Sequence, residues 1–374
     1  MRNLASIQKI VDIQPIEGAD KIECVQILGW KLVAKKNEFK IGELCVYIEI
    51  DSILPKIAAF EFMANYKYRV KTIRLRKQIS QGLAVNLKNL PEFKLENLKE
   101  GTDVTDILDV KKYDPDQAAE DKIVSRSVNK WWSPYAKYWL FQKIVLPIIL
   151  RKETATVFPS HLISKSDETR IQNIPKILAE YDGKVFIETE KLEGQSSTYS
   201  LEKKRFGKIK FHVCSREKRL PKRTTSNWWK IEEQLDIQET LDFLMTAYPA
   251  LAWNIQGEII GEGIQGNIYN VKGLDFYVYR LKKTELNGAV TFFNPYEGIN
   301  LLKEFGLKWV PIVGEYVLDK TTVETILKHV DGPSLLNSKH LREGSVFNLA
   351  VTETPFSFKA VSNTYLEEKA KKEV

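Results

Sequence analysis

The sequence predicts an α+β protein that begins with a small β-barrel. Residues 1–110 contain several short runs in which apolar and polar residues alternate, and turn signals such as Glu17-Gly18 and Pro55 separate them. From residue 156 onward, strand-like and helix-like runs interleave without the regular repeat of a parallel sheet. These patterns favour a closed barrel of the OB or SH3-like kind, followed by an α+β domain.

The composition is that of an ordinary globular protein. Of 374 residues, 43% are hydrophobic and 28% are charged, which excludes intrinsic disorder, collagen and coiled coil as descriptions of the whole chain. The three cysteines, Cys24, Cys45 and Cys214, form no C-x-x-C motif, and no two of the four histidines have metal-ligand spacing. We therefore expect a reducing compartment and chemistry that depends on Lys, Arg, Asp and Glu.

No stretch of the chain is typical of a secretion signal or a membrane span. The N-terminus has no long apolar region, and the most apolar stretch, 138–150, has thirteen residues, contains Lys143 and is broken by Pro147. A membrane-spanning helix needs about 20 apolar residues. We expect a cytoplasmic protein in which this stretch forms a buried or docking helix, and contact with a membrane surface is the less favoured alternative.

The chain divides into four expected parts. Residues 1–110 form the barrel, and the charged, aromatic-rich segment 111–155 forms a linker with a helical part. Residues 156–366 form the second domain, and residues 367–374 form a loose tail. The Trp-rich segment 128–152 has no derived role, and aromatic packing is the favoured interpretation.

In the second domain, the pattern predicts a helix at 174–181, a strand that ends near residue 190 and a hairpin around Gly207. Residues 227–249 have helical periodicity. Strands are expected at 256–265, 274–281, 344–351 and 356–361.

Positive charge is concentrated in one segment. Residues 201–230 contain eleven Lys or Arg against two Glu, a local charge of +9, whereas the whole chain carries +7. Such a segment attracts phosphate groups. A solvated basic hairpin without a ligand is the open alternative.

Lys191 is the candidate nucleophile. It follows the strand FIETE and precedes Glu193 and Gly194, and the glycine is expected to make a sharp turn. A lysine amine attacks phosphorus only when it is neutral, which nearby cations or burial favour. Taken alone, the same pattern equally describes a surface lysine in an ion pair.

An ordered set of motifs follows Lys191. These are Ser215-Arg216, Gly257-Glu258, the run at 275–281, Glu343-Gly344 and Lys359. The set resembles the motifs of the covalent nucleotidyltransferase superfamily, which contains polynucleotide ligases and mRNA capping enzymes. The resemblance implies that 156–366 is an adenylyltransferase domain of antiparallel sheets and helices, similar to ATP-grasp ligases.

Domain order separates the members of this superfamily. Capping enzymes and DNA ligases carry an OB domain after the last motif, but only fifteen residues follow Lys359. Here the barrel comes first. With the segments EGADKIE, GELCVYIEIDSILP and FPSHLISKSDETRIQN, this order resembles RNA ligases of the Deinococcus and Naegleria type. The resemblance covers nearly the whole chain and implies an N-terminal OB domain that binds RNA.

The resemblance implies an ATP-dependent reaction in three steps. Lys191 attacks the α-phosphate of ATP, releases pyrophosphate and retains AMP. The AMP then passes to an RNA 5′-phosphate, and a 3′-hydroxyl attacks that end and releases AMP. The expected partner is RNA with 3′-OH and 5′-phosphate ends, as in a nicked duplex under repair, and the expected state is a monomer.

The same resemblance assigns roles to further residues. A Mg²⁺ or Mn²⁺ ion is expected at Glu193, Glu258 and Glu343. The expected nucleotide-binding residues are Arg170, Glu190, Arg216, Tyr279 and Lys359, with Lys359 at the α-phosphate and Tyr279 against adenine. The expected RNA-binding residues of the basic hairpin are Lys203, Lys204, Arg205, Lys208 and Lys210.

Two departures and two alternatives accompany this interpretation. Val361 stands where the family often has a second lysine, and Glu193 stands where aspartate is commoner. Alternation along the strand predicts that Tyr277 and Tyr279 share a face, so a purely packing role for Tyr279 stays open. The alternative functions are an RNA guanylyltransferase and a non-catalytic RNA-binding relative of the ligases.

Overall fold

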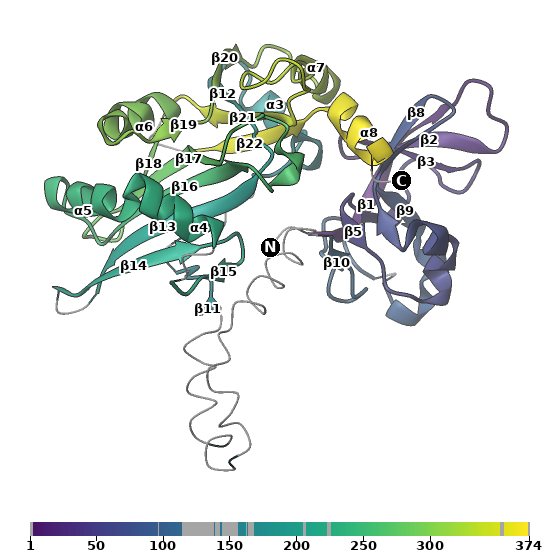
Figure 1. The fold of residues 1–374 in the computed structure, drawn as a ribbon. Coiled ribbons are helices and arrows are strands. Elements are labelled where there is room, and N and C mark those ends of the chain that lie inside the picture. The colour runs from purple at the N-terminus through teal and green to yellow at the C-terminus, as the bar shows by residue number, and fades with distance from the viewer. Residues whose placement is uncertain are drawn as a thin grey trace.

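The computed structural model shows a barrel domain beside a larger domain of two sheets (Figure 1). It describes residues 3–95, 97–113, 138, 143, 156–161, 163, 168–204, 207–222, 226–351 and 355–372. Within these ranges no helix has the length and apolar character needed to cross a membrane. Nearly all of the Trp-rich segment 128–152, and the helix expected there, lies outside the described residues.

One long strand organises the barrel. β1 (Ala5–Pro15) pairs with β4 (Leu44–Ile48) through its first half and with β2 (Ile22–Ile27) through its second half, and its register shifts in between. β3 (Trp30–Lys35) and β9 (Leu83–Asn86) complete a sheet in the order β3-β2-β1-β4-β9. A register shift of this kind bends a strand and lets a sheet curl toward closure.

Short elements complete the barrel domain. Both faces of β4 are buried, because Val46 and Ile48 enter one apolar cluster and Cys45 and Tyr47 enter another. The remaining elements are β5 (Ser52–Ile53), β6 (Arg69–Val70), β7 (Thr72–Leu75), β8 (Gln78–Gln81), β10 (Lys111–Lys112) and the 3₁₀ segments η1 (Ala58–Tyr66), η2 (Leu87–Asn89) and η3 (Pro91–Phe93). β10 pairs with β5, so this domain continues beyond its expected end at residue 110.

The larger sheet of the second domain is antiparallel except at one edge. Its strands in spatial order are β11 (Thr156–Val157), β15 (Lys218–Arg219), β14 (Ile209–Cys214), β13 (Gln195–Lys203), β16 (Ala252–Gly261), β17 (Leu274–Thr284) and β18 (Val290–Phe293), and β19 (Lys308–Trp309) pairs with β17 in parallel. The hairpin expected around Gly207 is present as β13 and β14.

The two faces of this sheet differ in chemistry. The face that includes Leu201 and Ile255 packs in one apolar core with α4 (Asn227–Leu235), α5 (Ile237–Ala247) and α6 (Pro295–Leu302). The opposite face carries a row of polar residues that lie opposite one another on four neighbouring strands, His212, Ser200, Asn254 and Lys282. All four residues are buried, and polar groups that lose water on burial need other partners.

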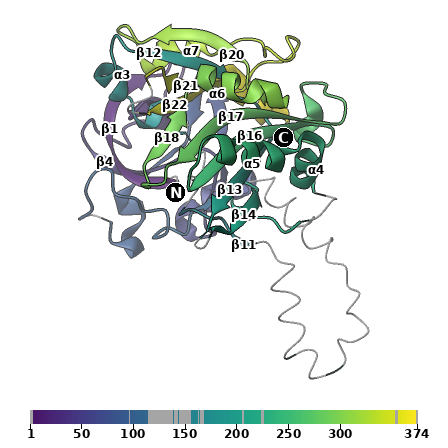
Figure 2. The ribbon, with the colours of Figure 1, turned by 90° about the vertical axis from the view of Figure 1, so that its left-hand side faces the viewer.

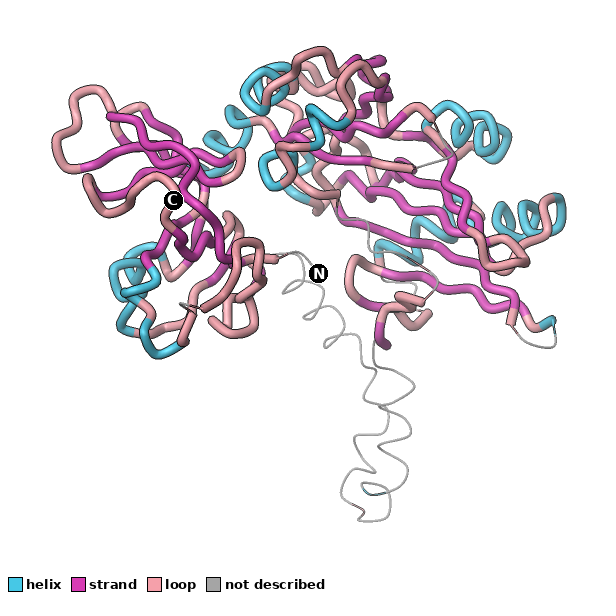
Figure 3. The backbone as a smooth tube through the Cα atoms, turned by 180° about the vertical axis from the view of Figure 1, so that it is seen from behind, coloured by secondary structure: helices cyan, strands magenta, loops and turns pink. Residues whose placement is uncertain are grey.

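The smaller sheet has the order β20-β12-β21-β22. Its strands are β20 (Ile312–Val317), β12 (Val185–Glu190), β21 (Gly344–Leu349) and β22 (Ser357–Val361), and Figure 2 shows it above the larger sheet. α3 (Ile177–Glu180) and α7 (Val323–His329) pack on it around Phe186, Phe347 and Phe358. Figure 3 shows strands inside both domains and most helices at the edges, which confirms the α+β class.

Two groups of contacts join the domains. The amide of Gly29, at the β2–β3 turn, donates to the carbonyl of Gln172 at 2.8 Å, and Trp30 Nε1 donates to Asn173 Oδ1 at 2.5 Å. The C-terminal helix α8 (Asn363–Lys372) lies between the domains (Figure 1). The expectation of a loose tail from residue 367 is therefore wrong for the described part of the C-terminus.

The remaining short segments are η6 (Ile171–Asn173), η8 (Gln265–Asn267) and η9 (Lys303–Phe305). Of these, η6 makes the contact with the barrel that fixes the segment leading into the second domain.

Candidate active site

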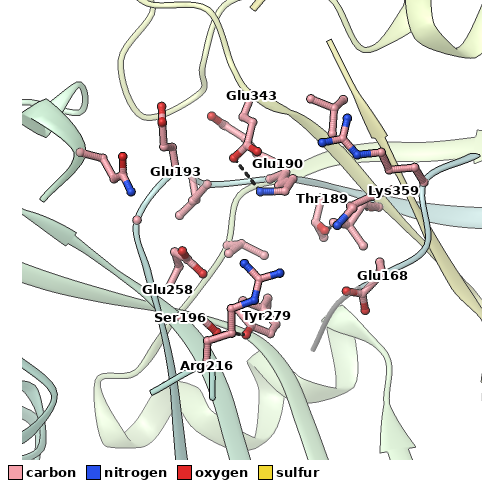
Figure 4. Close-up of a pocket in the computed structure, with 18 of the residues that line it drawn as sticks. Glu168, Thr189, Glu190, Glu193, Ser196, Arg216, Glu258, Tyr279, Glu343 and Lys359 are labelled. Atoms are coloured by element: carbon pink, nitrogen blue, oxygen red, sulfur yellow. Dashed lines mark hydrogen bonds and ion pairs between the residues drawn. The ribbon is translucent and has the colours of Figure 1, made fainter. Parts of the chain in front are cut away.

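A cavity of about 260 Å³ lies between the two sheets of the second domain, and barrel residues line one part of it. Figure 4 shows Glu193 and Glu258 on one side of it, Lys359 and Glu168 on the other, and Arg216 beside Tyr279. The structure places in this cavity all nine residues expected in catalysis or nucleotide binding, which are Arg170, Glu190, Lys191, Glu193, Arg216, Glu258, Tyr279, Glu343 and Lys359.

Strand pairing brings Lys191 to Glu343. β12 pairs with β21 so that Glu190 lies opposite Ser345, and the amide of Lys191 donates to the carbonyl of Gly344 at 3.0 Å. As a result Lys191 Nζ lies 2.6 Å from Glu343 Oε2, although the two residues are 152 positions apart in sequence. Both side chains are mostly shielded, with 26% and 17% exposure, so the pair forms in a partly desolvated site.

Close packing, and not the expected sharp turn, requires a glycine at position 194. Its φ angle is not positive, so no turn demands glycine there. A Cβ at this position would lie 2.3 Å from the carbonyl oxygen of Ile259 and 2.8 Å from Glu258 Cγ. Glycine therefore lets the chain after Lys191 pass directly against β16, which brings Glu258 to the cavity.

Electrostatics keep Glu343 ionised. Burial alone raises the pKa of this carboxyl, but the positive charges of Lys191, Lys369 and Lys359 outweigh burial and hold the pKa below its usual range. A carboxylate that stays ionised in this environment attracts a cation.

Glu190 differs from the other carboxylates. Its Oε2 accepts the amide of Leu335 at 2.8 Å, and its Oε1 is buried without a hydrogen-bond partner. Burial raises its pKa, and hydrogen bonds from Ser334 and Leu335 and the charge of Arg342 only partly oppose this. Glu190 thus holds the loop near residue 335 against β12 as well as lining the cavity.

A bulge turns Tyr279 toward the cavity. Arg280 pairs with Gln256 and Val278 with Gly257, so Tyr279 has no opposite residue on β16. Its hydroxyl lies 3.0 Å from Ser196 Oγ. Simple alternation is therefore interrupted at this strand, and of the two tyrosines only Tyr279 lines the cavity.

Arg170 and Lys359 are brought together by the backbone. The amide of Lys359 donates to the carbonyl of Thr169 at 3.0 Å, and Arg170 forms a parallel bridge with Lys359. Both side chains are at most 8% exposed. Two buried cations side by side suit a ligand with negatively charged phosphates.

The carboxylates fit a hydrated magnesium ion better than a closed metal site. Within the described residues, no three or more His, Cys, Asp or Glu side chains are arranged to hold a metal by themselves. Glu193 and Glu343 each already bind an ammonium group at 2.6 Å, so the site accepts positive charge. Mg²⁺ typically keeps several waters and uses one or two carboxylates together with substrate phosphates.

Comparisons with known proteins agree with this geometry. A family model described as an OB-fold domain matches residues 4–87, and a model described as RNA ligase matches residues 184–361. No curated protein sequence matches the chain.

Solved structures of Naegleria gruberi RNA ligase are similar over the full length. The ligase with pyrophosphate is 34% identical with a TM-score of 0.78, and the match covers 100% of each chain. The chain belongs to the RNA ligase family. A variant of the Naegleria ligase with ATP and Mn has the same identity and TM-score and covers 99% of this chain and 100% of that one. Another variant, with AMP and Mn, has 34% identity and a TM-score of 0.77 and covers 99% of both.

These matches confirm the fold class, the N-terminal OB-fold domain and the expected enzyme class of ATP-dependent RNA ligase. The roles of individual residues of the ligase stay predictions.

Sequence reasoning missed the residues that other segments of the ligase bring to the cavity. Lys369 of α8 binds Glu193 Oε1 at 2.6 Å, and Tyr365, one turn earlier, is buried. The i, i+4 spacing of Tyr365 and Lys369 is a signal that could have indicated a helix face there. The OB domain contributes Asp51, Arg69, Lys112 and Tyr113.

The four described residues among the expected RNA-binding residues of the ligase do not line the cavity. Lys203, Lys208 and Lys210 are exposed on the β13–β14 hairpin, and Lys204 pairs with Glu202 at 2.5 Å. Arg205 lies outside the described residues.

Proposed function

We propose that this RNA ligase seals RNA 3′-OH and 5′-phosphate ends and that AMP is carried on Lys191. The observation that carries the proposal is the position of the Lys191 amine, at the end of a buried strand, in a cavity lined by carboxylates and by the neighbouring cations Arg170 and Lys359. Structures of the Naegleria ligase with ATP, with AMP and with pyrophosphate support it, because ATP is the substrate and pyrophosphate a product of lysine adenylylation, and AMP is the group carried and released at the end.

In the first step, the neutral amine of Lys191 forms a bond to the α-phosphorus of ATP while the bond to the bridging oxygen of pyrophosphate breaks. Glu343 Oε2, 2.6 Å from Nζ, orients the amine, and the ammonium loses its proton to solvent before the attack. Lys359 and Arg170 stabilise charge on the phosphate oxygens, and Tyr279 offers a face for adenine.

Glu193, Glu258 and Glu343 are the residues that would hold Mg²⁺ or Mn²⁺, in part through the waters of the hydrated ion. When bound, such an ion supplies positive charge that favours the neutral amine and neutralises phosphate charge.

In the second step, the oxygen of an RNA 5′-phosphate displaces Lys191 from the adenylate, and the amine regains a proton. In the third step, a 3′-hydroxyl attacks the adenylylated phosphate and AMP leaves. Arg216 lies in the cavity where the RNA end must enter, and the exposed lysines of the β13–β14 hairpin hold RNA phosphates. A nicked duplex in RNA repair is the substrate and a monomer the active state in this proposal.

The test is incubation with radiolabelled ATP and Mg²⁺, followed by denaturing gel electrophoresis. The wild type should gain an acid-labile label that Lys191→Ala lacks, and labelled GTP should give none. An unlabelled wild type, or equal labelling of Lys191→Ala, overturns the proposal. Conversion of a nicked RNA duplex to a sealed strand then tests the later steps.

A further inference from the structure

The C-terminal helix α8 contacts the cavity and the OB domain at once. On one side, Lys369 Nζ binds Glu193 Oε1 at 2.6 Å and lies 3.3 Å from the Tyr365 hydroxyl. Tyr365 is 7% exposed, so this side of the helix is held firmly against the cavity.

The other side of α8 is fastened to the barrel. Glu367 forms a two-pronged ion pair with Arg74 of β7, and Asn363 Oδ1 accepts from Gln81 Nε2 of β8 at 3.0 Å. Leu366 packs against the apolar cluster of the barrel that contains Tyr47. Any displacement of Lys369 by movement of α8 therefore strains these contacts.

Charge repulsion opposes the binding of Lys369 and of a metal ion to Glu193 at the same time. The proposed metal site includes the Glu193 carboxylate, which is only 12% exposed and already binds one ammonium. A divalent cation brought there meets a positive charge at a distance of a few ångströms in a partly desolvated site, where like charges repel strongly.

We propose that Lys369 is an internal competitor for the metal at Glu193, and that its displacement on metal binding loosens α8 from the OB domain. The proposal rests on the metal assignment made under Proposed function. It gives the C-terminal helix a defined role, since occupancy of the catalytic cavity is then transmitted to the domain that faces the RNA.

The first test is titration with Mn²⁺, followed by electron paramagnetic resonance, on full-length protein freed of AMP with pyrophosphate. Lys369→Met should raise the Mn²⁺ affinity about two- to fivefold, because an ion pair of this exposure is worth roughly that factor. Lys369→Arg keeps the charge and should stay near wild type. Lys371→Met removes the same charge from an exposed position of the same helix and should also leave the affinity unchanged.

The second test is hydrogen–deuterium exchange of the wild type with and without Mg²⁺. Exchange in α8 and in β7–β8 should increase when the metal binds, and the increase should be lost in Lys369→Met. Unchanged or lower Mn²⁺ affinity of Lys369→Met, or slower exchange of α8 with Mg²⁺, overturns the competition.

Glu193→Gln separates this inference from the function on which it rests. If Glu193→Gln lowers the Mn²⁺ affinity but Lys369→Met does not raise that affinity, the metal assignment stands and only the proposed competition by Lys369 is wrong. If Glu193→Gln leaves Mn²⁺ affinity unchanged, Glu193 is not part of the metal site, and both the metal assignment and the competition fall.

Discussion

Replacing Gly194 by alanine tests whether close packing behind Lys191 sets the geometry of the site. The added Cβ would lie 2.3 Å from the carbonyl oxygen of Ile259, whereas real Cβ atoms essentially never approach closer than 3.0 Å. Because the obstacle is backbone in the middle of β16, the chain that carries Lys191 must move by at least about 0.7 Å, with a cost of about 1–3 kcal/mol.

A displacement of this size is large for a reaction that depends on alignment. Misplacement of a reacting group by about 1 Å can cost about 100-fold in rate. We therefore expect Gly194→Ala to slow single-turnover adenylylation by about 10- to 100-fold and to lower Tm by roughly 2–4 °C for each kcal/mol lost.

Gly332→Ala is the matched control. Its φ is not positive, and its Cβ would meet the nearest atom at 3.5 Å, an ordinary contact. It should keep the adenylylation rate and Tm of the wild type. Rapid-quench measurement of labelled enzyme and a thermal melt suffice, and a Gly194→Ala variant with both values unchanged would refute the packing argument.

Three further predictions concern other parts of the ligase. Burial lowers the pKa of His212 below 6.5, so the folded state favours the neutral imidazole, and the free energy of unfolding falls as the pH falls below 6.5. Denaturant titrations at pH 7 and pH 5.5 should show that the wild type loses more of its free energy of unfolding over this range than His212→Asn does, by up to about 1.4 kcal/mol per pH unit. Lys203→Gln with Lys208→Gln should weaken RNA binding and flatten its salt dependence while adenylylation stays near wild type, and an unchanged slope in a filter-binding assay contradicts this. Tyr279→Ala should raise the KM for ATP by about tenfold and Tyr279→Phe by much less, because stacking on the ring survives in phenylalanine; equal KM values would exclude stacking.

The catalytic strand and its partners follow from sequence because their order along the chain is informative. The apolar run before Glu188 identifies β12, and the ordered motifs at Lys191, Glu258 and Glu343 indicate phosphoryl chemistry before any coordinates are considered. The distances and contacts within the site do not follow from the sequence. The close approach at Gly194 depends on how this residue packs against Ile259, 65 positions later in the chain, which no local pattern encodes.

Interruptions of regular structure are a second kind of feature that the sequence specifies only in part. The apolar pattern changes phase between Ile7 and Ile10 in β1 and between Val278 and Leu281 in β17, close to the register shift of β1 and the bulge at Tyr279. The pattern of one strand does not tell which residue is left unpaired, because a bulge is a mismatch between two strands. The role of Lys369 is hidden for a similar reason, since a charged C-terminal segment is typical of a solvated end until its helix meets Glu193.

The junction at Gly29 has a consequence for how this enzyme can be divided. A Cβ there would lie 2.9 Å from the Cα of Gln172, and the adjacent Trp30 and Glu49 hold Asn173 through hydrogen bonds of 2.5 Å each. The short segment directly after Arg170 is thus held by the barrel as well as by its own domain, in whose core Ile171 is buried. A truncated ligase domain would lose the barrel half of this support, and a foreign OB module grafted in its place would need a glycine and a tryptophan at the same two positions.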